Sequence, residues 1–217
     1  LIRHPGVRTP GAWDGFEISV RAILGQQVTV RAATTMMGRV AERFGLTPAQ
    51  LEGADLESIG VVRTRANAIR TLASEVARGA ITFGASADCA ATVAALKAIP
   101  GIGDWTAQYI AMRALGEPDA FLSGDLVLRR LAGNCSAREL ERRSEAWRPW
   151  RAYAVMLLWL MGSDPMAERA IMASPEDAKT ARRKSSARTS HAQMDTKTHR
   201  GSAGRVHDGQ RCRLRRG

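Results

Sequence analysis

Cysteine is scarce in this chain, and its placement argues against several kinds of site. The three cysteines, Cys89, Cys135 and Cys212, are widely separated and odd in number. This spacing argues against a disulfide framework, a zinc site and a four-cysteine iron–sulfur cluster. The four histidines lie near the two ends of the chain, so the sequence does not support a histidine-based catalytic triad either. We therefore expect a protein of the reducing cytoplasm.

Long apolar runs are also missing. The densest run, residues 155–161, is far shorter than the roughly 18 residues of a membrane-spanning helix. The first residues do not follow the charged and then apolar order of a secretory signal. We expect no membrane partner. Because the chain begins at Leu1 rather than Met, we also expect it to be a piece of a longer polypeptide.

Positive charge is plentiful but unevenly distributed. The net charge is +11, yet residues 165–217 contain 13 Lys and Arg against 5 Asp and Glu, whereas residues 1–164 contain 19 against 16. The net charge therefore gives only weak support for nucleic-acid binding by the folded part. Residues 163–217 are rich in Ser, Thr, Arg and Lys without apolar periodicity. This composition predicts a basic, low-complexity, disordered tail after a domain at residues 1–162.

Helix signals dominate residues 1–162 and predict an all-α domain of roughly eight to ten short helices. Capping residues precede helix-periodic segments at Asp14, Thr29, Thr47 and Ser136. Pro149 opens a last helix that extends to about residue 161 and is apolar on most sides, so we expect it to be central. A strand-like pattern reaches no further than residues 80–83.

A tight turn at residues 99–103, IPGIG, separates two of these helices. Pro100 ends the first helix, and Gly101 and Gly103 allow positive φ and the close approach of a partner to the backbone. Asp104 suits the N-cap of the second helix. The turn therefore predicts a cup of backbone N–H groups that could hold a phosphate, although an ordinary helix corner has the same sequence.

Asp125 follows this turn, directly after Gly124 and before an apolar segment. One interpretation is a helix N-cap for residues 126–131. The other is a carboxylate that stabilises a developing cation, which a helix N-terminus would also favour as an anion. The two interpretations are compatible.

Aromatic residues cluster near the turn. Trp105 and Tyr109 are four residues apart on one helix face, and Trp159 lies on the last helix. Trp105 stands at the first turn after the proposed phosphate cup, where a flat aromatic wall suits a planar base. For Trp147 and Trp150 we expect core packing instead.

Two glutamines, Gln26 and Gln27, interrupt an otherwise regular helical pattern. They indicate either a kink with solvated side chains or a loop tip that fills the gap left by an extruded base.

Together these stretches resemble the helix-hairpin-helix DNA glycosylase superfamily, and within it the alkylation-repair branch of the DNA-3-methyladenine glycosylase II type. The matching segments are LKAIPGIGDWTAQYIAMRALGEPDAFLSGD at 96–125, FEISVRAILGQQVTV at 16–30 and WRPWRAYAVMLLW at 147–159. The resemblance covers about residues 5–162. It implies a catalytic carboxylate at Asp125, a base pocket of Trp105, Tyr109 and Trp159, DNA-phosphate contacts at Gly101, Gly103 and Thr106, and a minor-groove wedge at Gln27 and Gln26. It also implies a monovalent cation held by the backbone carbonyls of Lys97, Ile99 and Ile102, with no other cofactor required.

The resemblance also implies a reaction. Relatives that nick the DNA strand carry a lysine where this chain has Trp105, and an indole cannot form an imine, so we expect a monofunctional enzyme. It would hydrolyse the N-glycosidic bond of alkylated purines such as 3-methyladenine in double-stranded DNA and leave an abasic site. Gly124 and Leu126 depart from the best-known member of this branch, which affects the expected substrate range. The alternatives are a non-catalytic DNA-binding module and a glycosylase for another damaged base.

The same resemblance implies a setting for the domain. The N-terminal β-rich domain of the family is absent from residues 1–162, and we expect an alkyl-transfer or regulatory domain upstream in a longer polypeptide. We expect a monomer that is cytoplasmic and associated with the nucleoid.

Overall fold

The computed structural model describes residues 6–84 and 86–163. Within these residues the chain is helical and contains no strand, which confirms the all-α prediction. Residues 80–83, the strongest strand-like pattern, form bends and irregular backbone. The helices are α1 (Gly15–Leu24), α2 (Val30–Phe44), α3 (Pro48–Leu51), α4 (Arg63–Ala77), α5 (Cys89–Ala98), α6 (Asp104–Ala114), α7 (Leu126–Leu131), α8 (Ala137–Ser144) and α9 (Arg151–Ser163), with 3-10 turns η1 (Leu56–Ile59) and η2 (Glu145–Trp147).

The predicted capping residues begin their helices as expected. The side chains of Asp14, Thr29 and Ser136 accept hydrogen bonds from the backbone N–H groups of the residues three positions on. Asp104 is an exception. Gly103, which has no side chain, occupies the N-cap position of α6, so no side chain caps this helix, and the carboxylate of Asp104, the first helical residue, forms an ion pair with Lys97 Nζ at 2.8 Å.

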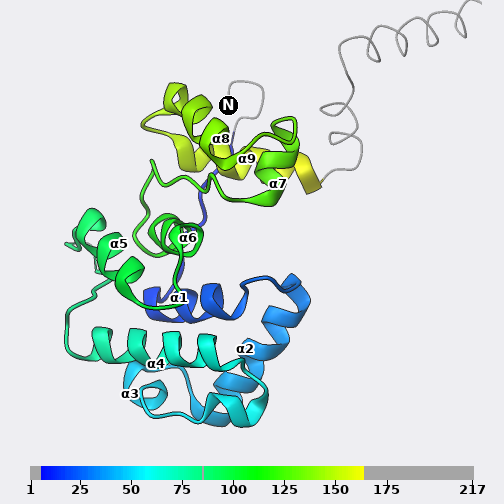
Figure 1. Cartoon of the computed structure of the whole chain (residues 1–217). Coiled ribbons are helices and arrows are strands. Elements are labelled where there is room, and N and C mark those ends of the chain that lie inside the picture. Colours follow the sequence, from blue (N-terminus) through cyan, green and yellow to red (C-terminus); the bar gives the residue numbers. More distant parts are fainter. Residues whose placement is uncertain (1–5, 85, 164–217) are drawn as a thin grey trace, which may run out of the picture. The chain divides into compact units, whose positions relative to one another are not determined.

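Two clusters of buried side chains make up the interior. The first lies among α1–α6 and includes Ile102 and Ile110, and the second includes Met112, Leu128 and Val155 from α6, α7 and α9. Helix α6 contributes to both clusters, and it lies between α1 and the group of α7, α8 and α9 (Figure 1). Helix α6 is therefore packed on two sides, and the residues that it carries have a fixed position.

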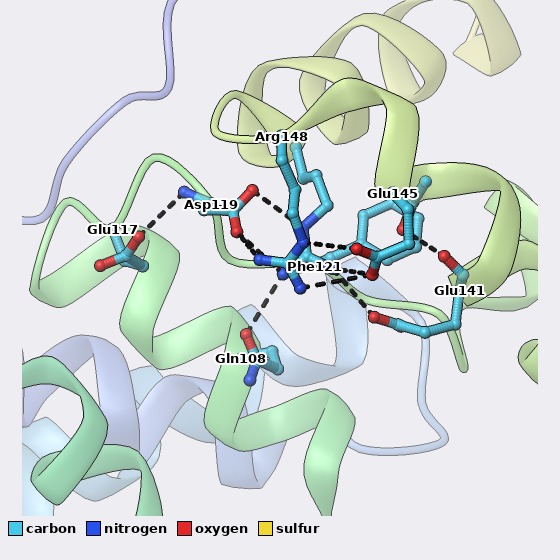
Figure 2. Close-up of polar contacts among 9 residues, drawn as sticks. Gln108, Glu117, Asp119, Phe121, Glu141, Glu145 and Arg148 are labelled. Carbon is cyan, nitrogen blue, oxygen red and sulfur yellow. Dashed lines mark hydrogen bonds and ion pairs between the residues drawn. The ribbon is translucent and has the colours of Figure 1, made fainter.

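A network of charges fixes the loop between α6 and α7 (Figure 2). Arg151, which is 7% exposed, donates to both carboxylate oxygens of Asp119 and to Glu141 at 2.9–3.1 Å. Arg148 also pairs with Asp119, and Gln108 on α6 accepts from the N–H of Phe121. The loop that ends at Asp125 is thus tied to α6, α8 and the start of α9.

The two tryptophans expected in the core behave differently. Trp147 is partly buried, and its ring contacts Phe121 edge to face at 5.9 Å between centroids. Trp150 is 54% exposed, so the core prediction is wrong for this residue. It immediately precedes α9 and contacts Tyr153 edge to face at 5.7 Å.

The predicted tail lies almost entirely outside the described residues, which end with α9 at Ser163. In the part of the chain that the structure describes, no helix combines the length and the apolar character needed to cross a bilayer.

Candidate active site

The turn between α5 and α6 is anchored by apolar side chains and exposes its backbone. Ile99 and Ile102 are each 4% exposed, whereas Gly101, Gly103 and Asp104 are exposed. Gly101 has φ +96°, a left-handed conformation that favours glycine, and the turn lies close to Ala68 of α4. The uncapped N-terminus of α6 presents backbone N–H groups that have no partner within the helix. The turn therefore has the geometry of an anion-binding helix start.

Thr106 contributes to this region differently from the prediction. It is 3% exposed, and its hydroxyl accepts a hydrogen bond from Gln26 Nε2 at 3.1 Å. The same Nε2 donates to the carbonyl of Gly101 at 3.0 Å. The Thr106 side chain therefore faces the Gln26 loop, and a contact with a phosphate would have to come from its backbone N–H.

Asp125 lies at the start of α7 and accepts hydrogen bonds from three directions. Its Oδ1 accepts from the N–H of Leu128 at 2.9 Å, as the N-cap interpretation requires. Its Oδ2 accepts from Trp105 Nε1 at 3.0 Å, and Trp159 Nε1 lies 3.4 Å from Oδ1. Asp125 as a whole residue is 9% exposed. A fixed carboxylate of this kind is suited to stabilising positive charge on a bound group.

The three predicted aromatic residues do come together. The rings of Trp105 and Tyr109 stack with centroids 5.3 Å apart and planes within 9°. Trp159 reaches them from α9, with its centroid 6.4 Å from that of Tyr109. A pocket of about 260 Å³ lies against these rings and is also lined by Arg21, Val28 and Val30.

A larger cleft of about 590 Å³ contains Asp125 and adjoins this pocket at Trp105. One side is formed by Gly101, Gly103 and the two glutamines, and the other by residues 124–127. Gly124 and Leu126, the two departures from the family pattern, line this cleft, and Leu126 is 75% exposed. A hollow of about 760 Å³ beside α8 is wider, but none of the predicted site residues lines it. The predicted site residues therefore place the candidate active site in the cleft that contains Asp125.

Of the predicted cation ligands, Lys97 and Ile99 lie at the C-terminal end of α5 and Ile102 lies in the turn that follows. The last carbonyls of a helix have no partner within it, which suits a hard cation. The carbonyl of Ile99 accepts from the N–H of Ile102 at 3.0 Å and retains a second lone pair. Among the described residues, no cluster of His, Cys, Asp and Glu side chains is suited to a metal ion.

Several site residues are missing from the sequence-based prediction. Arg21, one turn before Gly25, lines the aromatic pocket, and its guanidinium donates to Thr34 Oγ1 at 3.0 Å. Arg65 on α4 donates to the backbone carbonyl of Gln26. The position of Arg21, one helical turn before Gly25, is a local signal that could place its side chain near the Gln26 loop. No local pattern indicates the contact of Arg65 with Gln26.

Comparisons with known proteins agree with this arrangement. The sequence model of the family described as "HhH-GPD superfamily base excision DNA repair protein" matches residues 20–151. The chain is 35% identical over 171 residues to DNA-3-methyladenine glycosylase 2 of Escherichia coli, covering 72% of this chain and 61% of that protein. It is 36% identical over 182 residues to a probable bifunctional transcriptional activator/DNA repair enzyme of Mycobacterium tuberculosis, covering 76% of this chain and 37% of that one. The chain thus spans between about a third and two thirds of the length of these relatives.

Two solved structures of DNA glycosylases are similar in fold to this chain. A DNA-3-methyladenine glycosidase from Bacillus halodurans matches with a TM-score of 0.64 and 31% identity, over 75% of this chain and 81% of that one. A 3-methyladenine DNA glycosylase of Schizosaccharomyces pombe, in complex with abasic DNA, matches with a TM-score of 0.65 at 20% identity, over 75% and 86% of the two chains, and supports the fold alone. The chain therefore belongs to the HhH-GPD superfamily of base excision DNA repair proteins.

Proposed function

We propose that this protein is a monofunctional DNA glycosylase that releases alkylated purines such as 3-methyladenine from double-stranded DNA and leaves an abasic site. The observation that carries the proposal is the Asp125 carboxylate. Asp125 as a whole residue is 9% exposed, and its carboxylate is held by the indole N–H of Trp105 and lies beside an aromatic pocket. The names of the Escherichia coli and Bacillus halodurans relatives support the same activity.

The proposed reaction begins with the grip on DNA. The exposed N–H groups at the start of α6 hold a backbone phosphate, a contact that positions the strand without reading its sequence. The loop carrying Gln27 lies beside this turn on the same side of the cleft and approaches the duplex there. The damaged nucleotide then leaves the stack and its base enters the pocket of Trp105, Tyr109 and Trp159.

Asp125 acts at the sugar. As the bond from C1′ to the base nitrogen breaks, its electron pair leaves with the base and positive charge develops on the sugar ring. The carboxylate stabilises that charge, and a water molecule then adds to C1′ and gives up a proton. Trp105 has no amine to form an imine with C1′, so the proposal includes no strand cleavage.

Substitution of Asp125 by Asn tests this role. Opposite charges about 4 Å apart attract by about 4 kcal/mol at an effective dielectric constant of 20. The loss of that attraction would slow base release by roughly 10³-fold. The assay is single-turnover release of 3-methyladenine from methylated DNA. Asp14→Asn is the matched control, because it makes the same change at the N-cap of α1. Release by Asp125→Asn at the wild-type rate would contradict the proposed role.

A second candidate is a glycosylase for a neutral damaged base, and Arg21 is the observation that favours it. A fixed positive charge beside the aromatic pocket disfavours a cationic base and offers hydrogen-bond donors to a neutral one. Competition between 7-methylguanine and hypoxanthine in one release assay separates the two candidates. A non-catalytic DNA-binding module would release neither base.

Further parts of the proposal concern the setting of the domain. We propose that it acts as a monomer in the cytoplasm, associated with the nucleoid. We also propose that a monovalent cation binds the carbonyls of Lys97, Ile99 and Ile102 next to the DNA phosphate. The Mycobacterium tuberculosis relative, whose name joins a transcriptional activator to a DNA repair enzyme, supports a regulatory domain upstream.

A further inference from the structure

The loop between α1 and α2 is attached to the α5–α6 turn by the side chain of Gln26. Its Nε2 donates to the carbonyl of Gly101 at 3.0 Å and to the hydroxyl of Thr106 at 3.1 Å. An amide nitrogen has two hydrogens, so both are used. The Gln26 side chain is therefore engaged with the turn and is not available to enter DNA.

Helix α4 holds both partners of this contact. The guanidinium of Arg65 donates to the backbone carbonyl of Gln26. On the same helix, the side chain of Ala68 and the carbonyl of Thr64 lie 3.4 and 3.5 Å from where a Cβ on Gly101 would be, so the turn lies against α4. The loop is thus bonded to α4, the turn lies against the same stretch of α4, and the loop and the turn are bonded to each other.

Gln27, the next residue, has the opposite character. It is exposed and has φ +53°, a left-handed conformation that residues other than glycine adopt only when their surroundings impose it. Its neighbour Gln26 is held at its side chain and at its carbonyl, which supplies that constraint. Gln27 is thereby set at the edge of the cleft that contains Asp125 and the turn.

The geometry points to Gln26 as a positioning residue that couples the phosphate-binding turn to insertion of Gln27 into the duplex. This inference rests on the proposed glycosylase function. It revises the expected wedge, which would consist of Gln27 alone, with Gln26 and Arg65 as its support. Because the turn and the loop share α4, binding of a phosphate at the turn fixes where Gln27 enters relative to that phosphate.

The test compares two DNA contexts for one lesion. A 7-methylguanine is placed either in a fully paired duplex or in a single-nucleotide bulge, where the base is already unpaired and no opposite base is left behind. Gln26→Met keeps the length of the side chain and removes both hydrogen bonds. We expect it to slow single-turnover release at least tenfold in the paired duplex and less than threefold in the bulge.

Arg65→Met should show the same difference between the two contexts. Arg63→Met is the matched control: it removes a positive charge from an exposed position on the same helix and should slow release in both contexts equally. The ratio of the two rates does not depend on the fraction of protein that is folded. Equal slowing of the two contexts by Gln26→Met would overturn the inference, whereas failure of the wild-type protein to release the base from either DNA would overturn the proposed function itself.

Discussion

Trp105 and Asp125 should be energetically coupled, and a double-mutant cycle measures the coupling. In the wild-type protein, Trp105 Nε1 donates to Asp125 Oδ2 at 3.0 Å. Trp105→Phe keeps an aromatic ring and leaves that oxygen without this donor. In Asp125→Asn, the remaining oxygen can still accept from Leu128, because Asn is as good an N-cap as Asp. The new NH₂ group would then face the indole N–H, and two donors would oppose each other.

The expected magnitude follows from the charge and burial of the carboxylate. A hydrogen bond to a charged group contributes about 1.5–3 kcal/mol to stability, and Asp125 is only 9% exposed, so water replaces the lost donor poorly. Trp105→Phe should therefore cost about 2 kcal/mol more in the wild-type background than in Asp125→Asn. The packing lost from Trp to Phe is common to both backgrounds and cancels.

The assay is thermal and urea unfolding of the four proteins in the cycle. A coupling of about 2 kcal/mol corresponds to roughly 4–8 °C in Tm for a domain of this size. Trp150→Phe, at a position 54% exposed, is the control and should combine additively with Asp125→Asn. A coupling between Trp105 and Asp125 smaller than about 0.5 kcal/mol would refute the claim that the indole holds the carboxylate.

Two further predictions concern residues outside the site. Asp119→Asn should lower the free energy of unfolding by about 3 kcal/mol, because it leaves the buried Arg151 guanidinium without its main partner. Urea unfolding checks this, and a change below about 0.5 kcal/mol would contradict it. Burial, reinforced by Glu117, raises the pKa of the Cys89 thiol to about 11, so its thiolate fraction should increase about tenfold per pH unit between pH 7 and 9.5. The rate of alkylation by iodoacetamide, followed by mass spectrometry of the peptide, should increase in parallel, and a rate that levels off near pH 8.5 would contradict the raised pKa.

The sequence predicted the parts of the site that depend on neighbouring residues. The turn at residues 99–103, the placement of Trp105 and Tyr109 on one helix face and the N-cap interpretation of Asp125 all depend on short spacing along the chain, and the structure contains each of them. Helix starts were predictable for the same reason, since a capping side chain acts within three residues.

The wrong predictions concern two residues at helix starts, and the contacts that were not predicted join distant segments. Asp104 does not cap α6, because Gly103 takes the N-cap position and Asp104 is the first helical residue, with its carboxylate paired to Lys97. Trp150 was expected in the core, but it precedes α9 with its ring exposed. The hydrogen bonds of Gln26 to a turn 75 residues away, and of Trp159 to Asp125, depend on how helices pack together, which local pattern does not specify.

Because α6 lies between the two buried clusters, the contact between Trp105 and Asp125 depends on the packing of both clusters. Ala107 and Ile110 pack into one cluster, and Ala111 and Met112 into the other, on the same helix that carries Trp105. Opening of either cluster would uncover one face of α6 and release the tryptophan from the carboxylate. A molecule opened in this way would lose the hydrogen bond from Trp105 that holds the Asp125 carboxylate. Partial loss of stability at either cluster should therefore abolish the proposed glycosylase activity, because both clusters hold the helix that places Trp105 against Asp125.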